Sequence, residues 1–290
     1  MREFELDEFE SLFERASIPV FDIAGVELAS IAAIMCGQQL DHSIVALAAY
    51  LAKRFGGKTT VYSPVGISSE AGARFLQEQG HGTAGEQFDS PEELAGRLDE
   101  TACELVLLPE PDAQGERVSI LDELARLATV PILIVRNPIA QARDVFKNVL
   151  HSLTGNLEQI EHLAYSFHLV EDHGKLVLLH IVELEDLDDV RETLKVSPEI
   201  SSEAGDELVA DLAHHAERHL KGLVAATRDE PYDVSYRLSA GEVLPEVQRE
   251  VDRGGYGLLV VGTHREGMRH LDADEYQMMH LVRDIPVLAL

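Results

Sequence analysis

The sequence predicts two α/β domains in tandem, each a doubly wound parallel sheet covered by helices on both faces. Apolar runs of strand length alternate with amphipathic stretches of helix length after residue 30, which is typical of parallel sheets. The order of these segments occurs twice, from Ile31 to Arg136 and from Phe146 to Leu290. Such internal similarity indicates a duplication. Both copies end in a strand beside a proline, VPILIVR in the first and IPVLAL in the second.

The first copy opens with the apolar run IAAIMCG, followed by an amphipathic segment at 41–57. In that segment Ile44, Leu47 and Leu51 fall on one face and two glycines close it, as at the end of a helix. SPEEL at 90–94 places a serine three residues before a glutamate, which is a helix-start signal. We expect strands at 31–37, 58–64, 86–88, 104–109 and 130–136, and helices at 41–57, 69–79, from 90 onward, and at 118–128.

The second copy repeats this order, and its strands predict right-handed crossovers in a parallel sheet. We expect strands at 146–153, 175–183, 232–239, 256–263 and 285–290, and helices at 157–173, 204–227, 243–253 and before the last strand. The junction RNPIAQARDV is short, so the two domains are expected to pack together. The predicted organisation is an N-terminal segment at 1–27, a first domain at 28–138 and a second at 145–290.

The N-terminal segment lies outside the duplication. Its residues Leu6, Phe9, Phe13 and Ala16 fall near one helical face, and the other side is acidic. We favour docking of this segment onto its own domain over a role as a partner-binding helix.

Charge excludes several classes of partner. The chain has 24 basic and 52 acidic residues, and 24 − 52 gives a net charge of −28, which repels nucleic acid and anionic membranes. The carboxylates are spread along the chain and only six basic residues are lysine. This acidic composition suits a salt-rich cytosol, or it is simply a solubilising surface.

Location and cysteine use follow from the same composition. No apolar run approaches the roughly 20 residues of a spanning helix, and the N-terminus is acidic where a signal peptide is basic. We therefore expect a cytoplasmic protein without membrane insertion. Cys36 and Cys103 are far apart and lack the spacing of a metal or redox pair, so both are expected to be small core residues.

Two segments carry a resemblance to a known family. YGLLVVGTHREG at 256–267 resembles the penultimate strand and glycine loop of the universal stress protein family, and IPVLAL resembles its closing strand. In the first copy 37–65, ELVLLP and VPILIVR are similar to the corresponding family segments. The resemblance implies Rossmann-like, adenine-nucleotide alpha-hydrolase-like domains, each with a five-stranded parallel sheet. It also implies dimerisation through the final strands, which in a tandem chain becomes an internal pseudo-dimer.

Nucleotide-binding members of that family carry an aspartate after the first strand and a loop of the form G-x2-G-x9-G-(S/T). In the second domain Gly262 matches the first glycine, but Arg265, Ala273 and Asp274 stand at the other three positions. Thr154 stands at the aspartate position. The resemblance therefore does not imply ATP binding here.

The first domain departs from the pattern as well. Gln38 occupies the aspartate position, and Pro109, Val118 and Ser119 occupy the glycine-loop positions. Proline removes an amide donor, and valine disfavours the conformations that are open to glycine.

The charges near the second loop also disfavour a phosphate. Asp272 or Asp274 is expected to cap the amides of the following helix, and Glu275 adds a first-turn charge. A carboxylate about 5 Å from a phosphate charge costs roughly 3 kcal/mol at an effective dielectric constant near 20. Arg265 would offset part of this repulsion. We predict no cofactor, and the alternative is ATP or a related nucleotide bound by Gly262, Thr263, His264 and Arg265 with Thr154 nearby.

The other candidate sites are not predicted to bind a metal or to catalyse a reaction. His215 and His219 share a helix face beside His214, but no third ligand is evident, so no metal is predicted. The acidic run at 183–189 lacks the glycine spacing of a calcium loop, and we interpret it as a solvated loop. No G-x-S-x-G, G-x4-G-K-(S/T) or H-E-x-x-H motif occurs, so no catalytic residue is assigned and the protein is not expected to be an enzyme.

The function favoured by these observations is a non-catalytic stress-response regulator that binds a protein partner, a second copy of itself or a small ligand across its pseudo-dimer. The alternative is a nucleotide-binding switch that uses the loop of the second domain. A third hypothesis, suggested by the acidic composition and by the family's attachment to transporters, is a regulator of a transporter or of ion homeostasis in a salt-adapted cell.

Overall fold

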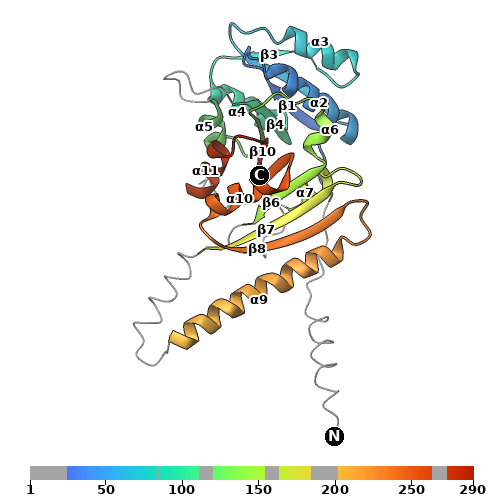
Figure 1. Ribbon diagram of the computed structural model, residues 1–290. Coiled ribbons are helices and arrows are strands. Elements are labelled where there is room, and N and C mark those ends of the chain that lie inside the picture. Colours follow the sequence, from blue (N-terminus) through green and yellow to red (C-terminus); the bar gives the residue numbers. More distant parts are fainter. Residues whose placement is uncertain (1–24, 84, 111–119, 154–162, 184–201, 263–272) are drawn as a thin grey trace.

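The computed structural model describes residues 25–83, 85–110, 120–153, 163–183, 202–262 and 273–290. These residues form one continuous ten-stranded sheet with helices on both faces (Figure 1). The sheet is built from two halves, with β1 to β5 in the first and β6 to β10 in the second. The N-terminal segment at 1–24 lies outside the described residues.

The first half follows the predicted order of elements. Its strands are β1 (Ser30–Ile34), β2 (Lys58–Pro64), β3 (Glu86–Phe88), β4 (Leu105–Pro109) and β5 (Ile132–Val135). Its helices are α2 (Asp41–Phe55), α3 (Glu70–Glu78), α4 (Pro91–Glu100) and α5 (Ile120–Leu127). The α2 helix has an acidic residue in its first turn, basic residues in its last turn and Gly56 as a left-handed cap, an arrangement that suits both ends of the helix dipole.

The second half repeats that order. Its strands are β6 (Asn148–Leu153), β7 (Lys175–Glu183), β8 (Asp233–Gly241), β9 (Leu258–Val261) and β10 (Val287–Ala289). Its helices are α6 (Ala142–Val145), α7 (Leu163–Leu169), α9 (Ser202–Ala226), α10 (Val243–Gly254) and α11 (Ala273–Leu281). Figure 1 shows the long α9 helix running along β8 at the outer end of this half.

Strand order confirms the predicted fold class. The sheet runs β3-β2-β1-β4-β5-β10-β9-β6-β7-β8. Neighbouring strands within each half are parallel, and the two halves have equivalent strand orders. The halves meet where β5 and β10 pair antiparallel, with Leu133 opposite Leu288. The internal pseudo-dimer through the final strands is therefore present, and we call the β5–β10 pair and its flanking contacts the seam.

The core lies on both faces of the sheet. On one face a single apolar cluster continues across the seam and includes residues of α2, α3, α7 and α9. On the other face α4 and α5 cover the first half and α10 covers the second. The α11 helix bridges the two clusters of that face, because Met279 packs with the first half and Met278 with the second. Burial of apolar side chains across the seam is the dominant force that holds the halves together.

Two local predictions require correction. The helix expected over 157–173 ends at Leu169, and His173 takes a left-handed backbone conformation with φ of 63°. The short helix α6, inside the segment expected to be a plain junction, was not predicted. Both differences arise at the seam, where tertiary contacts override local preference.

In the described part, no helix is both long and apolar enough to cross a membrane. Cys103 is buried and Cys36 is half-buried, and neither forms a disulfide. Burial is the main reason why the pKa of each thiol is raised to about 11.

Candidate functional site

The expected nucleotide loop of the second half begins at the carboxyl end of β9. Gly262 follows β9 directly and is half-buried. Thr154, Thr263, His264 and Arg265 lie outside the described residues. The structure therefore places one of the five predicted site residues at the expected edge of the sheet.

The helix after this loop begins at Ala273. Asp272 lies outside the described residues, and the side chains of Asp274 and Glu275 are outside them as well. Capping of the helix amides by these carboxylates stays a prediction.

The same edge of the second half presents a buried histidine. The Nδ1 atom of His180 lies 3.1 Å from the carbonyl oxygen of Leu153, at the end of β6. Burial lowers the pKa of His180, although the contact with Leu153 opposes the shift. The imidazole is therefore neutral at pH 7, and it offers no positive charge to an anion at this edge.

In the first half, the chain's own carboxylate occupies the loop after β1. The amide nitrogens of Cys36 and Gly37 donate to Asp41 over 3.0 and 2.9 Å. Gly37 has a φ of 73°, which glycine adopts easily. Asp41 is buried, and the loop closes around it. Two amide donors that face the carboxyl edge of the sheet are thus already satisfied without a ligand.

Asp41 was missed by the sequence comparison, which pointed to Gln38 as the equivalent of the family aspartate. The carboxylate that serves the loop comes instead from the first residue of α2, three positions later. After β4, Pro109 ends the strand as expected, and Val118 and Ser119 lie outside the described residues.

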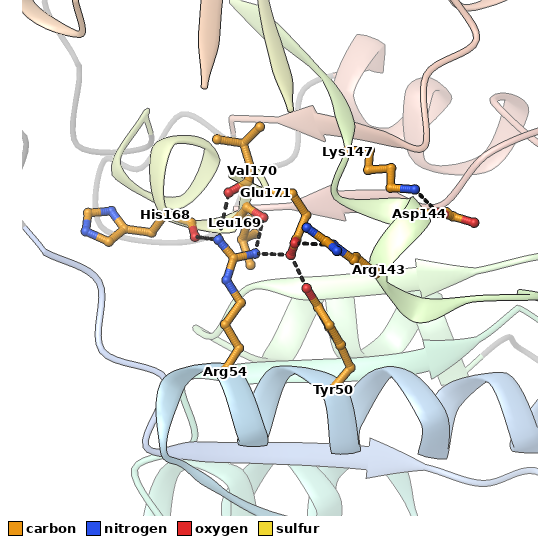
Figure 2. Close-up of polar contacts among 9 residues, drawn as sticks. All are labelled: Tyr50, Arg54, Arg143, Asp144, Lys147, His168, Leu169, Val170 and Glu171. Atoms are coloured by element: carbon orange, nitrogen blue, oxygen red, sulfur yellow. Dashed lines mark hydrogen bonds and ion pairs between the residues drawn. The ribbon is translucent and has the colours of Figure 1, made fainter. Parts of the chain in front are cut away.

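The seam carries two polar clusters that join the halves. The first, the Glu171 cluster, consists of Tyr50, Arg54, Arg143 and Glu171 (Figure 2). Tyr50 and Arg54 come from α2 of the first half, and Glu171 follows α7 of the second. Glu171 is 7% exposed, and its carboxylate accepts hydrogen bonds from Tyr50, from Arg54 over 2.9 Å and from Arg143 over 2.8 Å.

Arg54 also caps the end of α7. Its guanidinium donates to the carbonyl oxygens of His168, Leu169 and Val170 over 2.6 to 2.8 Å. These carbonyls belong to the last turn of a helix and its exit, where backbone acceptors lack helical partners and the dipole favours a cation. Figure 2 shows the guanidinium set against this turn. This capping explains why α7 ends four residues before the predicted end at His173.

Tyr50 is fixed on both of its sides. Its ring stacks on Phe146 with the centroids 5.9 Å apart, and its hydroxyl donates to Glu171. Burial, followed by the Glu171 contact, raises the pKa of Tyr50 to about 12. The hydroxyl is therefore protonated at neutral pH and acts as a donor.

The second group, the Arg136 cluster, consists of Glu110, Asp122, Arg136, Tyr276 and His280. Arg136 follows β5, and its Nε donates to Glu110 after β4. From α11 of the second half, His280 lies 3.6 Å from Glu110 and 3.1 Å from Asp122, and Tyr276 donates to Asp122 over 2.9 Å. The cluster thus joins α11 to the carboxyl ends of β4 and β5.

Arg136 is the unusual member. Its side chain is 5% exposed, and both of its terminal nitrogens are buried without a hydrogen-bond partner among the described residues. Burial lowers the pKa of this guanidinium, and the contact with Glu110 opposes the shift. Glu110 is the counter-ion, and although burial raises its pKa, His280 and Arg136 lower it on balance.

The predicted histidine group does not form a closed site in the part of the chain that the structure describes. The rings of His215 and His219 lie 5.0 Å apart on α9, as the spacing predicted, and His214 and His215 are exposed. No group of three or more His, Cys, Asp or Glu side chains among the described residues is placed to hold a metal ion. Of the acidic run at 183–189, only the backbone of Glu183 is described.

Solved structures share this two-half architecture. A universal stress protein from Archaeoglobus fulgidus DSM 4304 matches with a TM-score of 0.56 and 12% identity, over 91% of this chain and 96% of that one. A functionally unknown protein from Pseudomonas aeruginosa PAO1 matches with a TM-score of 0.59 and 17% identity, over 91% and 92%. The fold is that of the tandem universal stress proteins.

A further structural match is to part of a membrane transport protein. The cytoplasmic domain of a prokaryotic cation chloride cotransporter has a TM-score of 0.50 and 11% identity, over 91% of this chain and 95% of that one. No protein-family model matches the sequence, and no curated protein matches it either. At these identities the likeness concerns the fold alone.

The polar clusters were not predicted. Tyr50 and Arg54 are four residues apart on α2, so they share a helix face. Arg136 directly follows the apolar strand ILIV, and a charged residue at the end of a buried strand indicates a polar contact there. Neither pattern predicts which residue is contacted. Glu171 is 117 residues from Arg54, and His280 comes from the other half of the chain.

Proposed function

We propose that this chain is a non-catalytic stress-response regulator of universal-stress-protein type, which binds a protein partner or a small ligand as a preformed pseudo-dimer. The observation that carries the proposal is the loop after β1 in the first half. Its amides donate to Asp41, so the chain itself fills a position that a ligand oxygen would otherwise use. The neutral His180 at the equivalent edge of the second half supports the same interpretation.

The seam supports binding without large rearrangement. Strand pairing, a shared apolar cluster and two polar clusters connect the halves. A partner would therefore meet a surface that is already ordered, which reduces the entropy cost of association. The likeness to a cotransporter domain is a reason to include membrane transporters among the candidate partners.

Calorimetric titration of the full-length protein with ATP, ADP and AMP, each with and without magnesium, tests the absence of nucleotide binding. Mass spectrometry of any compound released from freshly purified protein complements it. We expect no saturable heat at millimolar nucleotide and no co-purified nucleotide. Saturable binding that survives at 0.15 M salt and is lost in Arg265→Ala would contradict the proposal.

The alternative is a nucleotide-dependent switch in which Gly262, Thr263, His264 and Arg265 hold phosphate groups. Gly262 lies at the carboxyl end of β9, which is the edge where doubly wound folds bind ligands. If this alternative holds, Arg265→Ala abolishes nucleotide binding and Arg218→Ala, which removes an exposed arginine of α9, leaves it unchanged. Equal effects of the two variants would indicate general electrostatics only.

The regulatory role is tested in cells that lack the gene. We expect reduced survival under stress, with rescue by the wild-type chain and by Arg265→Ala. Rescue by the wild-type chain alone would point to the nucleotide switch. Normal survival of the deletion strain under salt, oxidative and starvation stress would remove the support for a stress-response role.

A further inference from the structure

A hollow on the second half lies away from the seam, between the edge strand β8 and α10. Its volume is about 310 Å³ and it is lined by three arginines, two glutamates and neighbouring residues of β7 and β8. The arginines are Arg237 on β8 and Arg249 and Arg253 on α10. Three arginines and two glutamates give a net charge of +1 here, in a chain whose net charge is −28.

The two glutamates of the hollow are held by hydrogen bonds from neighbouring side chains. Glu250 has 5% of its side chain exposed and accepts from the Tyr256 hydroxyl over 2.6 Å and from Arg237 over 2.7 Å. Glu246 accepts from the Ser239 hydroxyl over 2.6 Å and contacts Arg249. Each carboxylate therefore holds one arginine in place.

The arginines keep most of their donors available. A guanidinium has five N–H groups in a fixed plane. Arg237 and Arg249 each contact a glutamate through one terminal nitrogen, and about half of each side chain is exposed. Arg253 is exposed and has no hydrogen bond or ion pair with the residues that the structure describes, although its charge lies near Glu246.

A surface ladder of ion pairs is the simplest competing explanation for these charges. Such a ladder explains Arg237 and Arg249, because each is matched by a glutamate. It does not explain Arg253, which adds a third cation to the same hollow. Planar guanidinium groups bind oxyanions through paired hydrogen bonds, and they do so better when other groups orient them.

We propose that the hollow between β8 and α10 binds the carboxylate or phosphate group of a small anionic molecule, with Arg237, Arg249 and Arg253 as its ligands. The volume is at the lower end for small-molecule sites, which fits a compact polyanion. The site is distinct from the loop after β9 and uses none of its residues. It adds a ligand class to the proposed function without depending on it.

The test titrates the full-length protein with citrate and, separately, with inorganic phosphate at constant ionic strength. We expect saturable binding of one of them to the wild-type protein and at least tenfold weaker binding to Arg253→Gln. Arg253 is the choice because its side chain is exposed and makes no hydrogen bond or ion pair with the described residues. Its replacement should therefore leave the fold intact, and equal melting temperatures would confirm this. Arg218→Gln is the matched control, because it removes one exposed arginine of α9 and the same charge.

The two probes separate the sources of the oxyanion. Tighter binding of citrate indicates a carboxylate ligand, and tighter binding of phosphate indicates a phosphorylated one. No saturable binding of either probe, or equal weakening in Arg253→Gln and Arg218→Gln, overturns the proposal. Nucleotide binding that is lost in Arg253→Gln and kept in Arg265→Ala would belong to this hollow and not to the loop after β9.

Discussion

The two polar clusters of the seam both surround a buried charge, but they satisfy it to different degrees. In the Glu171 cluster, the carboxylate accepts from three side chains, and the two terminal nitrogens of Arg54 donate to Glu171 and to three backbone carbonyls. In the Arg136 cluster, the guanidinium donates to Glu110 through one nitrogen, while the two others are buried and find no partner in the part of the chain that the structure describes.

The difference indicates which cluster stabilises the seam. A buried charge whose hydrogen bonds are made resists separation of the halves, because each of these bonds has a small net stabilising effect that is lost on opening. A buried charge with unmet donors has already lost part of its hydration without full compensation. We therefore expect the Glu171 cluster to contribute most of the polar stability and the Arg136 cluster to contribute little.

The largest effect is expected for Arg54→Ala. This change removes four hydrogen bonds, three of them to the end of α7, and leaves Glu171 with fewer donors. We expect a loss of about 2 kcal/mol in the free energy of unfolding, measured by urea denaturation at pH 7. Lys53→Ala, at the exposed neighbouring position of the same helix turn, is the control and should cost less than about 0.5 kcal/mol. Equal losses would remove the special role of Arg54.

Tyr50→Phe tests the same cluster through pH. At pH 7 the loss of the hydroxyl bond to Glu171 should cost about 1 kcal/mol. Because the pKa of Tyr50 is raised from 10 in the unfolded chain to about 12, the unfolded state loses this proton first.

The contribution of Tyr50 to the free energy of unfolding is complete below pH 10 and is lost as pH rises toward 12. Other tyrosines shift in the same direction, so the measurement is the difference between wild type and Tyr50→Phe across this range. A difference that does not change with pH would contradict the assignment.

Arg136→Met should cost less than Arg54→Ala although Arg136 is the more buried arginine. Methionine fills similar space and removes two unpartnered donors, but it leaves Glu110 without its ion pair. Because Glu110 is partly exposed and keeps its contact with His280, we expect a loss of about 1 kcal/mol, which is less than for a fully buried pair. The double change Arg136→Met with Glu110→Gln should return stability to within about 0.5 kcal/mol of wild type or above it. A double variant that is less stable than Arg136→Met alone would show that the cluster is needed for the seam.

The smallest effect is expected for Tyr276→Phe. Tyr276 is 44% exposed, and its hydroxyl bond to Asp122 competes with water. The change should alter the free energy of unfolding by less than about 0.5 kcal/mol in the same urea experiment. If Tyr276→Phe lowered the free energy of unfolding as much as Tyr50→Phe, the two polar clusters would stabilise the seam equally, contrary to our expectation.

Much of the fold could be predicted because it is encoded in local pattern. The apolar run at 104–109 became β4, and the amphipathic segment at 41–57 became α2 over Asp41–Phe55. The association of the two halves through their final strands followed from the resemblance and is confirmed by the pairing of β5 with β10. The antiparallel direction of that pair comes from the structure. Element ends at the seam were less predictable, as the early end of α7 shows, because a side chain from the other half binds its last carbonyls.

The candidate site was only partly accessible to the same reasoning. Gly262 stands after its strand as expected, whereas the role of Asp41 was missed. A position-by-position comparison assigns a carboxylate to one place in the chain, but a side chain can serve a loop three residues away if the backbone turns toward it. The hollow between β8 and α10 has no sequence signature, since Arg237 and Arg253 come together only when α10 packs beside β8.

The sequence alone determined the duplication, the order of strands and helices, and the acidic character of the chain, because periodicity and composition act over short stretches. The tertiary structure decided how the loop after β1 is filled, how Arg54 and Glu171 meet across the seam, and why Arg136 is left with unmet donors. These features depend on contacts between residues more than a hundred positions apart or on the path of a single turn. Local pattern does not encode such distances, and only the packed chain sets them.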